Sequence, residues 1–322
     1  MKPWHADIER HIAIWSQRLG HLNWWPRFVY HFTDVRNAVH VLQSGNLYSR
    51  AEATRLGLMQ VDNASSEVIG QTRSERLEFV RLYFRPRTPT QFRNEGIRPR
   101  GQQELDAHCP VPVYFCFDAQ AILSNDDTQF SDGNLASTRA SYSGERDFFL
   151  NIPFDRVFHE GVIRQDDDKA EIIFRRNAEI LVPNRLSLES GLKYVVCRSA
   201  AERQTLLQLL PAPLRQHWTP LVRVIEQGLF YRQWTFVEQV VTVDDAVVFR
   251  FNPDSRTPGP FAAVFSYRES GRGPERAWRG SRDDLRGALE IQVLNATEGV
   301  VTFQLDDSLA FAGSVVFNEL PF

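Results

Sequence analysis

The chain has 322 residues, 43% of them hydrophobic and 24% charged, which is typical of soluble globular proteins and long enough for two domains. Its net charge of −3 excludes a uniformly basic nucleic-acid-binding protein, although a local basic patch is compatible with it. The sequence shows neither a signal-type N-terminal segment nor an apolar stretch of about 18 residues, so we expect a cytoplasmic protein without a membrane span.

Hydrophobic periodicity predicts a mixture of helices and strands in the first part of the chain. In order, the patterns predict a helix over 4–20, a strand at Phe28–His31, a helix at Asn37–Leu42 capped by Gly45, a strand at Leu77–Phe84 and a buried central strand at Val111–Phe117. The polar stretch Asn125–Gly144 predicts a long exposed loop. Short strands are expected at 172–174 and 180–182, on either side of a charged turn.

The segment Arg85–Gln102 has the most unusual local composition in the chain. It combines five arginines and three prolines with a single acidic residue, and the prolines Pro86, Pro89 and Pro99 exclude a helix. An extended basic loop of this kind suits contacts with phosphates and stacking on a base. The nucleic-acid-binding candidates are Arg85, Arg87, Phe92, Arg93, Arg98 and Arg100. The alternative is a solvated basic loop, or arginines that act as structural partners of an acidic loop.

The composition and hydrophobic pattern of the sequence change in its last third. Residues 200–231 are rich in leucine and valine and predict helices, whereas short apolar or alternating runs from Thr235 onward predict an all-β region. The sequence therefore divides into an N-terminal helical extension (1–26), a main α+β domain (27–199), a helical connector (200–234) and a β-rich C-terminal domain (235–322).

Two polar clusters stand out in the main domain. His31 and Thr33 alternate along a strand end and so share a face, and Asn37 follows one helical turn later. Such a trio is suited to ribose hydroxyls and a carboxamide. The alternative is a helix cap formed by Thr33 or Asp34, with His31 packed beneath it.

The second cluster contains Glu179, which follows Arg175 and Arg176 and precedes an apolar strand. A carboxylate placed there could hold ribose hydroxyls, stabilise an oxocarbenium-like state and accept a proton. The alternative is an exposed glutamate paired with a neighbouring arginine, and Glu171 is a competing candidate.

Cysteine and histidine spacing does not predict a metal site. His108 and Cys109 are adjacent but have no second pair at ligand spacing, and no Walker motif or glycine-rich dinucleotide fingerprint is present. The cysteines Cys109, Cys116 and Cys197 are odd in number, so we expect buried free thiols.

With these residues collected, the chain resembles the DarT family of DNA-base ADP-ribosyltransferases, the toxins of DarTG toxin–antitoxin systems. Four motifs over roughly residues 27–200 carry the resemblance: Tyr30-His31-Phe32-Thr33 with Asn37, Tyr83-Phe84-Arg85-Pro86-Arg87-Thr88-Pro89, His108-Cys109-Pro110-Val111-Pro112-Val113, and Ala178-Glu179-Ile180-Leu181-Val182. The resemblance implies a fold like that of poly-ADP-ribose polymerases, NAD as the donor and a base in single-stranded DNA as the acceptor. It also implies a cognate antitoxin that removes ADP-ribose from DNA, and a role in phage defence.

Individual residues follow from the same resemblance. His31, Thr33 and Asn37 match the NAD-binding motif, Glu179 matches the catalytic glutamate, and Arg73, with Arg76 second, matches the active-site arginine. The segment Thr88-Pro89-Thr90 departs from the thymidine-modifying branch and resembles the branch associated with guanosine. The alternatives are transfer to RNA or protein, or a non-catalytic module that binds nucleic acid through its arginine-rich segment.

Overall fold

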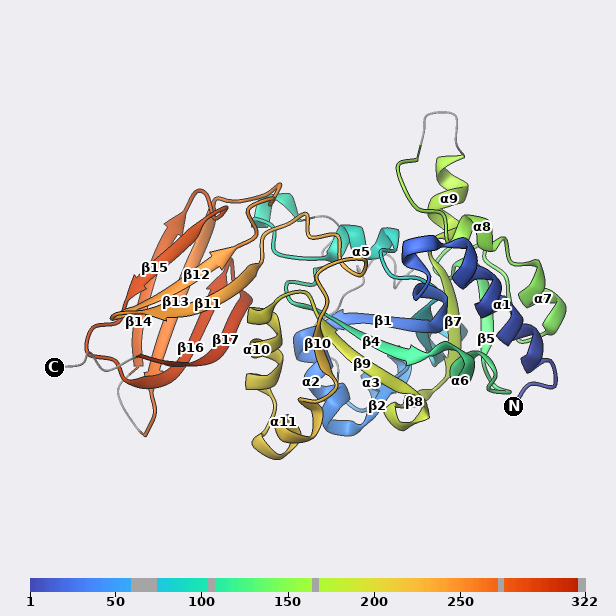
Figure 1. The fold of residues 1–322 in the computed structure, drawn as a ribbon, viewed down its shortest axis with the longest axis horizontal. Helices are drawn as coiled ribbons and strands as arrows, with labels where there is room; N and C mark the ends of the chain where they lie inside the picture. Colours follow the sequence, from blue (N-terminus) through green and yellow to red (C-terminus); the bar gives the residue numbers. More distant parts are fainter. Residues whose placement is uncertain (59–73, 104–107, 164–167, 272–274, 318–322) are drawn as a thin grey trace. The chain divides into compact units, whose positions relative to one another are not determined.

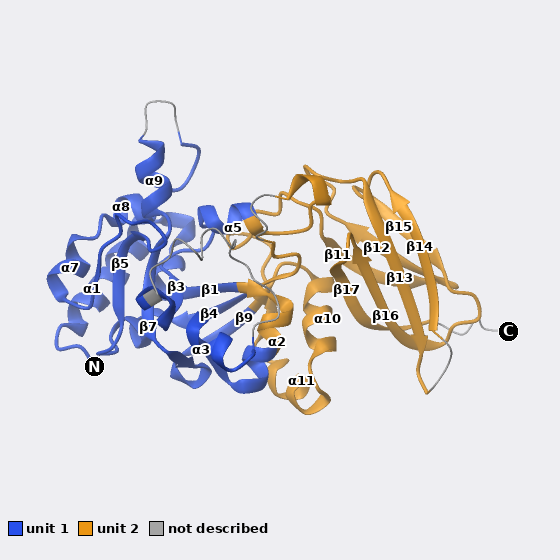
Figure 2. Cartoon of the chain, turned by 180° about the vertical axis from the view of Figure 1, so that it is seen from behind, with its two compact units in different colours: residues 1–32, 40–93, 114–195 blue, residues 33–39, 94–113, 196–322 orange. Residues whose placement is uncertain are grey.

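The computed structural model describes residues 1–58, 74–103, 108–163, 168–271 and 275–317, which form two compact units (Figure 2). Unit 1 contains residues 1–32, 40–93 and 114–195, and unit 2 contains residues 33–39, 94–113 and 196–322. Among the described residues no helix is long and apolar enough to cross a membrane.

An eight-stranded sheet runs through the N-terminal two thirds of the chain. Its strand order is β10-β9-β4-β1-β3-β7-β5-β6. The strands are β1 (Phe28–Asp34), β3 (Phe79–Tyr83), β4 (Pro112–Asp118), β5 (Gln129–Asn134), β6 (Tyr142–Ser143), β7 (Ala178–Pro183), β9 (Leu192–Cys197) and β10 (Val222–Val224). A separate pair joins β2 (Asn46–Tyr48) to β8 (Arg185–Ser187). The apolar run that forms β4 lies inside the sheet and is almost wholly buried, as the sequence predicts.

Short helices and turns connect these strands (Figure 1). The α-helices are α1 (His5–Arg18), α2 (Val35–Ser44), α3 (Arg50–Arg55), α5 (Pro89–Asn94), α6 (Ala119–Leu123), α7 (Arg146–Asn151), α8 (Phe154–Val157) and α9 (Lys169–Arg175). The 3-10 turns are η1 (Gly20–Leu22), η2 (Trp25–Arg27), η3 (Ser74–Glu78), η4 (Arg100–Gln102) and η5 (Leu188–Ser190). Helix α1 packs on α7 and α8. The ring of His11 on α1 lies 5.0 Å from the ring of Phe149 on α7 and 4.1 Å from the ring of Phe154 on α8. Helix α2 ends where Gly45 adopts a positive φ of 69°, as expected for a C-terminal glycine.

Unit 2 contains helices α10 (Ala200–Leu209) and α11 (Ala212–Trp218), followed by the C-terminal strands. These strands form a three-stranded sheet, β11-β12-β15, and a four-stranded sheet, β14-β13-β16-β17, which enclose one apolar core. Their bounds are β11 (Val237–Val243), β12 (Ala246–Phe251), β13 (Phe261–Glu269), β14 (Glu275–Arg282), β15 (Ala288–Gln292), β16 (Glu298–Leu305) and β17 (Ser308–Val316). The predicted all-β character of the C-terminal region is therefore confirmed.

Four local predictions are wrong. The prolines of the arginine-rich segment do not prevent the short helix α5, because Pro89 occupies its first position, where no backbone N–H is needed. The predicted loop at 125–144 contributes β5 and β6 to the sheet. Residues 172–174 lie in helix α9, and the helical pattern at 200–231 ends at Trp218, beyond which strand β10 forms. The three cysteines are buried and free, as predicted.

Candidate active site

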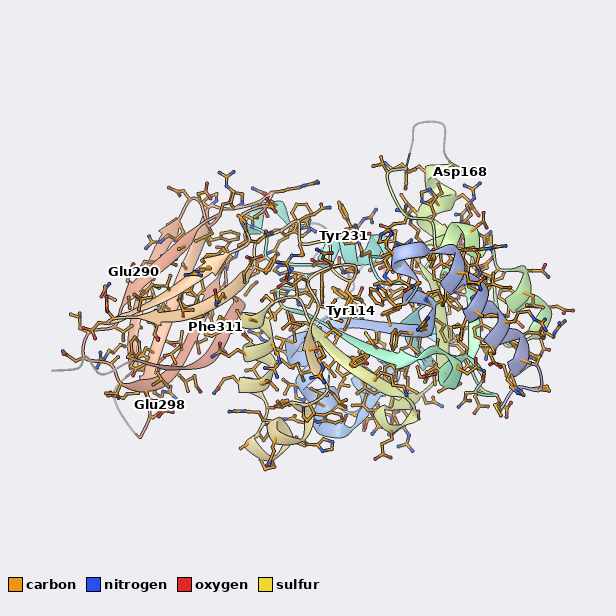
Figure 3. The ribbon with its side chains drawn as sticks, viewed as in Figure 1. Tyr114, Asp168, Tyr231, Glu290, Glu298 and Phe311 are labelled. Carbon is orange, nitrogen blue, oxygen red and sulfur yellow. The ribbon has the colours of Figure 1, made fainter. Side chains whose placement is uncertain are left out.

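His31 lies in the middle of β1 and is held by a neighbouring strand. Its Nδ1 lies 3.0 Å from the carbonyl oxygen of Arg81, which can only accept a hydrogen bond, so Nδ1 carries the proton. Burial lowers the pKa of His31, so the ring is neutral and its Nε2 is an acceptor. On the same strand, Tyr30 and Phe32 pack against Tyr114 of β4, which is labelled in Figure 3.

Thr33 and Asn37 contact one another directly. The Asn37 amide donates to Thr33 Oγ1 over 3.3 Å, and Thr33 is buried. The capping alternative also holds in part, because Asp34 Oδ1 accepts from the backbone N–H of Arg36 at the start of α2. Burial raises the pKa of Asp34 to about 6. Asp34 therefore supplies the cap, while Thr33 pairs with Asn37.

Glu179 is buried in strand β7, with an exposed fraction of 2%. Its Oε1 accepts from the backbone N–H of Leu135 over 3.1 Å, whereas Oε2 has no hydrogen-bond partner among the described residues. Ser131 holds the Glu179 backbone by accepting from its N–H over 2.8 Å. Burial raises the pKa of Glu179, and Arg81 opposes this. The alternative of an exposed glutamate paired with Arg175 or Arg176 is wrong, since Glu179 is buried. Arg175 pairs with Glu171 and Asp132.

Arg81 is a charged residue of this site that sequence reasoning missed. It lies on β3, and its Nε is 3.5 Å from Glu179 Oε2. The available signal was an arginine in the middle of the otherwise apolar strand Phe79–Tyr83. Tyr83 is the direct partner of Glu179 in the register between β3 and β7, and burial, followed by the Glu179 charge, raises its pKa. His31 and Glu179 are thus each in contact with Arg81.

Arg76 lies at the base of the site and holds a loop. Its guanidinium donates to the carbonyl oxygens of Leu135, Ser137 and Ala140, at 2.6, 3.0 and 3.2 Å. This loop supplies the Leu135 N–H that binds Glu179. Arg76 therefore has a structural role in positioning the carboxylate. The preferred match to the family arginine, Arg73, lies outside the described residues.

The six nucleic-acid-binding candidates occupy different environments. Arg85 is buried, donates to Val157 and Glu160 and stacks 4.7 Å from the Trp25 ring, so it is a structural residue rather than an exposed one. Arg87 is partly exposed and pairs with Glu160 over 3.0 Å. Phe92 is half-buried and Arg93 is exposed, both on α5.

The last two candidates belong to unit 2. Arg98 is buried and stacks 4.4 Å from the Trp234 ring. Arg100 is exposed and forms an ion pair with Asp307. Arg87, Phe92 and Arg93 belong to unit 1, and their side chains are partly or fully exposed.

Comparison with solved structures finds proteins of similar fold. DarT from Thermus sp. 2.9 in complex with ADP-ribosylated ssDNA aligns with 64% of this chain and 97% of its own, at 16% identity and a TM-score of 0.50. The structure of the same Thermus protein in complex with NAD⁺ aligns with 64% of this chain and 98% of its own, at 15% identity and a TM-score of 0.48. No curated protein sequence matches the chain.

A family model decides the assignment. The model described as "ssDNA thymidine ADP-ribosyltransferase, DarT" matches residues 30–231. The chain therefore belongs to the DarT family of ssDNA ADP-ribosyltransferases, and the enzyme class predicted from sequence is confirmed. The matched range begins at Tyr30, beside the His31 motif, and includes Arg76, Arg81 and Glu179.

Proposed function

We propose that this protein cleaves NAD⁺ and transfers ADP-ribose to a base of single-stranded DNA, with Glu179 as the catalytic residue and His31, Thr33 and Asn37 at the donor site. The observation that carries the proposal is the Glu179 carboxylate, buried in a strand within the matched family region, with one oxygen that no described residue satisfies by a hydrogen bond. Buried polar atoms without a hydrogen-bond partner are rare in folded proteins and need an explanation.

The residues present fit a nicotinamide dinucleotide. A ribose hydroxyl can donate to Glu179 Oε2, and the neutral His31 ring offers an acceptor at Nε2 for a second hydroxyl. NAD⁺ supplies the bond to be broken, between its nicotinamide and ribose. The positive charge that develops on the ribose as this bond breaks is stabilised by a nearby carboxylate in a site of low polarity.

The same carboxylate serves the acceptor. A base amine or ring nitrogen that attacks the ribose must lose a proton, and Glu179 is the general base we assign to that step. Single-stranded DNA suits this reaction because its base edges are accessible without the energetic cost of flipping a base out of a duplex. The accessible Arg87 and Arg93, with Phe92, provide phosphate contacts and a stacking surface for the strand.

For the acceptor base we propose guanosine, although the matching family is described by thymidine. The support is the segment Thr88-Pro89-Thr90, which departs from the thymidine branch. The Thr90 hydroxyl donates a hydrogen bond to Asn177 Oδ1 over 3.0 Å. Thr90 also forms a hydrogen bond with Tyr83, the strand partner of Glu179. The departure in sequence therefore lies beside the catalytic strand.

Incubation of the protein with NAD⁺ and defined oligonucleotides, followed by mass spectrometry, tests the reaction. We expect an added ADP-ribose on single-stranded DNA that contains guanosine, and none on an oligonucleotide with thymidine but no guanosine. Glu179→Gln keeps the shape of the side chain and removes its charge, so it should bind NAD⁺ but release less than 1% of the wild-type nicotinamide, in line with losses of about 10²–10³ for key transition-state groups. Modification by the Gln variant at the wild-type rate would move the catalytic role to Glu171.

Two further outcomes of this experiment distinguish the proposed reaction from the alternative functions. Transfer to RNA or to protein, with none to DNA, would replace the proposed acceptor. Failure to release nicotinamide under any condition would support a non-catalytic nucleic-acid-binding module.

The toxin role is tested in cells. Induced expression of the wild-type protein should stop growth, whereas Glu179→Gln should not. Co-expression of an ADP-ribosyl-DNA hydrolase, the antitoxin activity we propose, should restore growth. Equal toxicity of the wild-type and Gln proteins would separate toxicity from catalysis.

A further inference from the structure

Arg81 makes two contacts with the candidate site through different parts of the same residue. Its backbone carbonyl accepts from His31 Nδ1 at 3.0 Å, and its side-chain Nε lies 3.5 Å from Glu179 Oε2. One of its two terminal guanidinium nitrogens, Nη2, donates to the carbonyl oxygen of Arg76 over 3.3 Å. The side chain is therefore anchored at one end while it faces the carboxylate at the other.

From this geometry we infer that Arg81 is the positioning residue that keeps the Glu179 carboxylate ionised and correctly oriented for NAD⁺ cleavage. This inference rests on the proposed function. Burial of a carboxylate favours its neutral form, and a cation within about 4–6 Å opposes that effect. Glu179 is 2% exposed, so without a nearby cation it would tend to be protonated, and a protonated acid neither stabilises an oxocarbenium ion nor accepts a proton.

Among the described residues, the other groups that face Glu179 do not replace Arg81. Arg76 also favours the ionised form, but its guanidinium is bound to three carbonyl oxygens of the loop that follows β5. Leu135 supplies a neutral N–H to the other carboxylate oxygen. Tyr83, opposite Glu179 on β3, has a pKa raised by burial, so it is neutral near physiological pH.

Side-chain substitution at this position tests one contact at a time. The carbonyl that holds His31 belongs to the backbone and is present in every variant, so a change in the side chain acts on Glu179. Arg81 is also 27% exposed, so its replacement does not leave a large cavity in the core. Arg81→Met replaces the charged side chain with an apolar one, and Arg81→Gln replaces it with a polar, uncharged one. Arg81→Lys keeps the positive charge.

The direction of the expected shift in the pH profile follows from the ionisation of the Glu179 carboxylate. Activity needs ionised Glu179 and is lost as pH falls through its pKa. Removing the opposing cation raises that pKa, so the acidic limb of the pH profile should move to higher pH by about one to three pH units. In Arg81→Lys the limb should move by less than half of the shift seen in Arg81→Met.

The measurement is nicotinamide release from saturating NAD⁺ between pH 4.5 and 9, with thermal melts to confirm folding. Arg146→Met is a matched control, because Arg146 forms an exposed ion pair with Asp7 away from Glu179, and it should keep the wild-type profile. An acidic limb unchanged in Arg81→Met and Arg81→Gln would overturn the inference, as would a shift in Arg81→Lys as large as in Arg81→Met. If Arg81→Met does not fold, the Gln and Lys variants give the same decision. A wild-type protein that releases no nicotinamide would instead refute the proposed function.

Discussion

Single side chains around Glu179 are held by neighbours that come from distant parts of the sequence. Leu135, which binds the carboxylate, lies 44 residues before Glu179, and Arg76, which holds the Leu135 loop, lies a further 59 residues upstream. Sequence reasoning singled out Glu179 as a candidate because a charged turn before an apolar strand is a local pattern. It could not identify Arg76 as a loop anchor or Arg81 as a carboxylate partner, because both roles depend on contacts between segments far apart in the sequence.

The anchoring role of Arg76 predicts a combined loss of stability and activity. Arg76→Met leaves the buried carbonyl oxygens of Leu135 and Ala140 without a charged donor. We expect the free energy of unfolding to fall by about 3 kcal/mol, since each unsatisfied buried group costs roughly 1–3 kcal/mol. Urea melts measure this loss, with Arg146→Met as the surface control, expected to leave the urea melt close to that of the wild type because exposed ion pairs contribute little. A wild-type melt and a wild-type rate of NAD⁺ cleavage would contradict the role.

A buried ionic network in unit 2 predicts a dependence of stability on pH. Arg198 contacts both Glu95 and Glu202, and Glu95 also accepts from the backbone N–H groups of Tyr231 and Arg232. Burial, with a smaller contribution from the charge of Glu95, raises the pKa of Glu202 to about 7. Two buried carboxylates share one arginine. Between the ordinary pKa of 4.5 and about 7, Glu202 therefore keeps its proton in the folded state and releases it in the unfolded state.

The sign follows from this raised pKa. The contribution of Glu202 to stability is fully present below its ordinary pKa of 4.5 and is lost as pH rises toward about 7. Glu202→Gln should therefore flatten the fall in stability over that window and should be more stable than the wild type at pH 8. Urea melts at a series of pH values measure both effects. A Gln variant that is less stable than the wild type at pH 8 would show that the charged form of Glu202 stabilises the fold.

At the scale of elements, prediction succeeded where the pattern was local. The helix that ends at Gly45, the apolar central strand β4 and the alternating strands after Thr235 each carry their own signal. It failed where tertiary contacts decide the structure. The polar residues of β5 read as a loop, but they pair with the apolar strand β7 from Gln129 to Asn134, and one irregularity in that ladder places the loop that binds Glu179.

The arginine-rich segment gives a prediction at the same scale. Arg93 is exposed on α5, whereas Arg98 is buried beneath Trp234. Arg93→Gln should reduce the log–log salt slope of single-stranded DNA binding by about 0.7, the value for one phosphate contact. Arg98→Gln should lower the melting temperature and leave the slope unchanged. Fluorescence anisotropy at several salt concentrations measures the slopes, and equal slopes for Arg93→Gln and the wild type would remove α5 from the path of the DNA.

At the scale of the whole molecule, the domain boundary near residue 235 stays a prediction. Contacts within unit 2 join residues on the two sides of this boundary. Helix α10 donates from Gln204 to the carbonyl oxygen of Ser314 over 2.7 Å, and its Thr205 accepts from the backbone N–H of Ala312 over 3.1 Å. Ile97 and Ala201 belong to the same apolar core as the C-terminal strands. A cut at residue 236 would pass through this core.

We therefore expect deletion of residues 236–322 to abolish cooperative folding of what remains of unit 2. The deletion exposes Ile97 and Ala201, and it removes the partners of α10. Thr33 and Asn37, which we propose at the donor site, belong to the same unit, so nicotinamide release should fall as well. Thermal melts and NAD⁺ cleavage of the shortened and full-length proteins measure both effects. A shortened protein that melts cooperatively and cleaves NAD⁺ at the full-length rate would place an independent β-domain after residue 235.

A core substitution in the full-length protein tests the same point without a cut. Phe311 on β17 (Figure 3) is fully buried and lies 5.8 Å from the Phe249 ring. Phe311→Ala should lower the free energy of unfolding by about 3–5 kcal/mol, the usual cost of emptying a large buried site. If α10 and the strands fold as one body, helix signals from α10 and fluorescence from Trp278, which packs on this core, should be lost in a single shifted transition. A transition that moves for the Trp278 signal alone would mean that the strands unfold separately from α10, and the boundary predicted from the sequence would then stand.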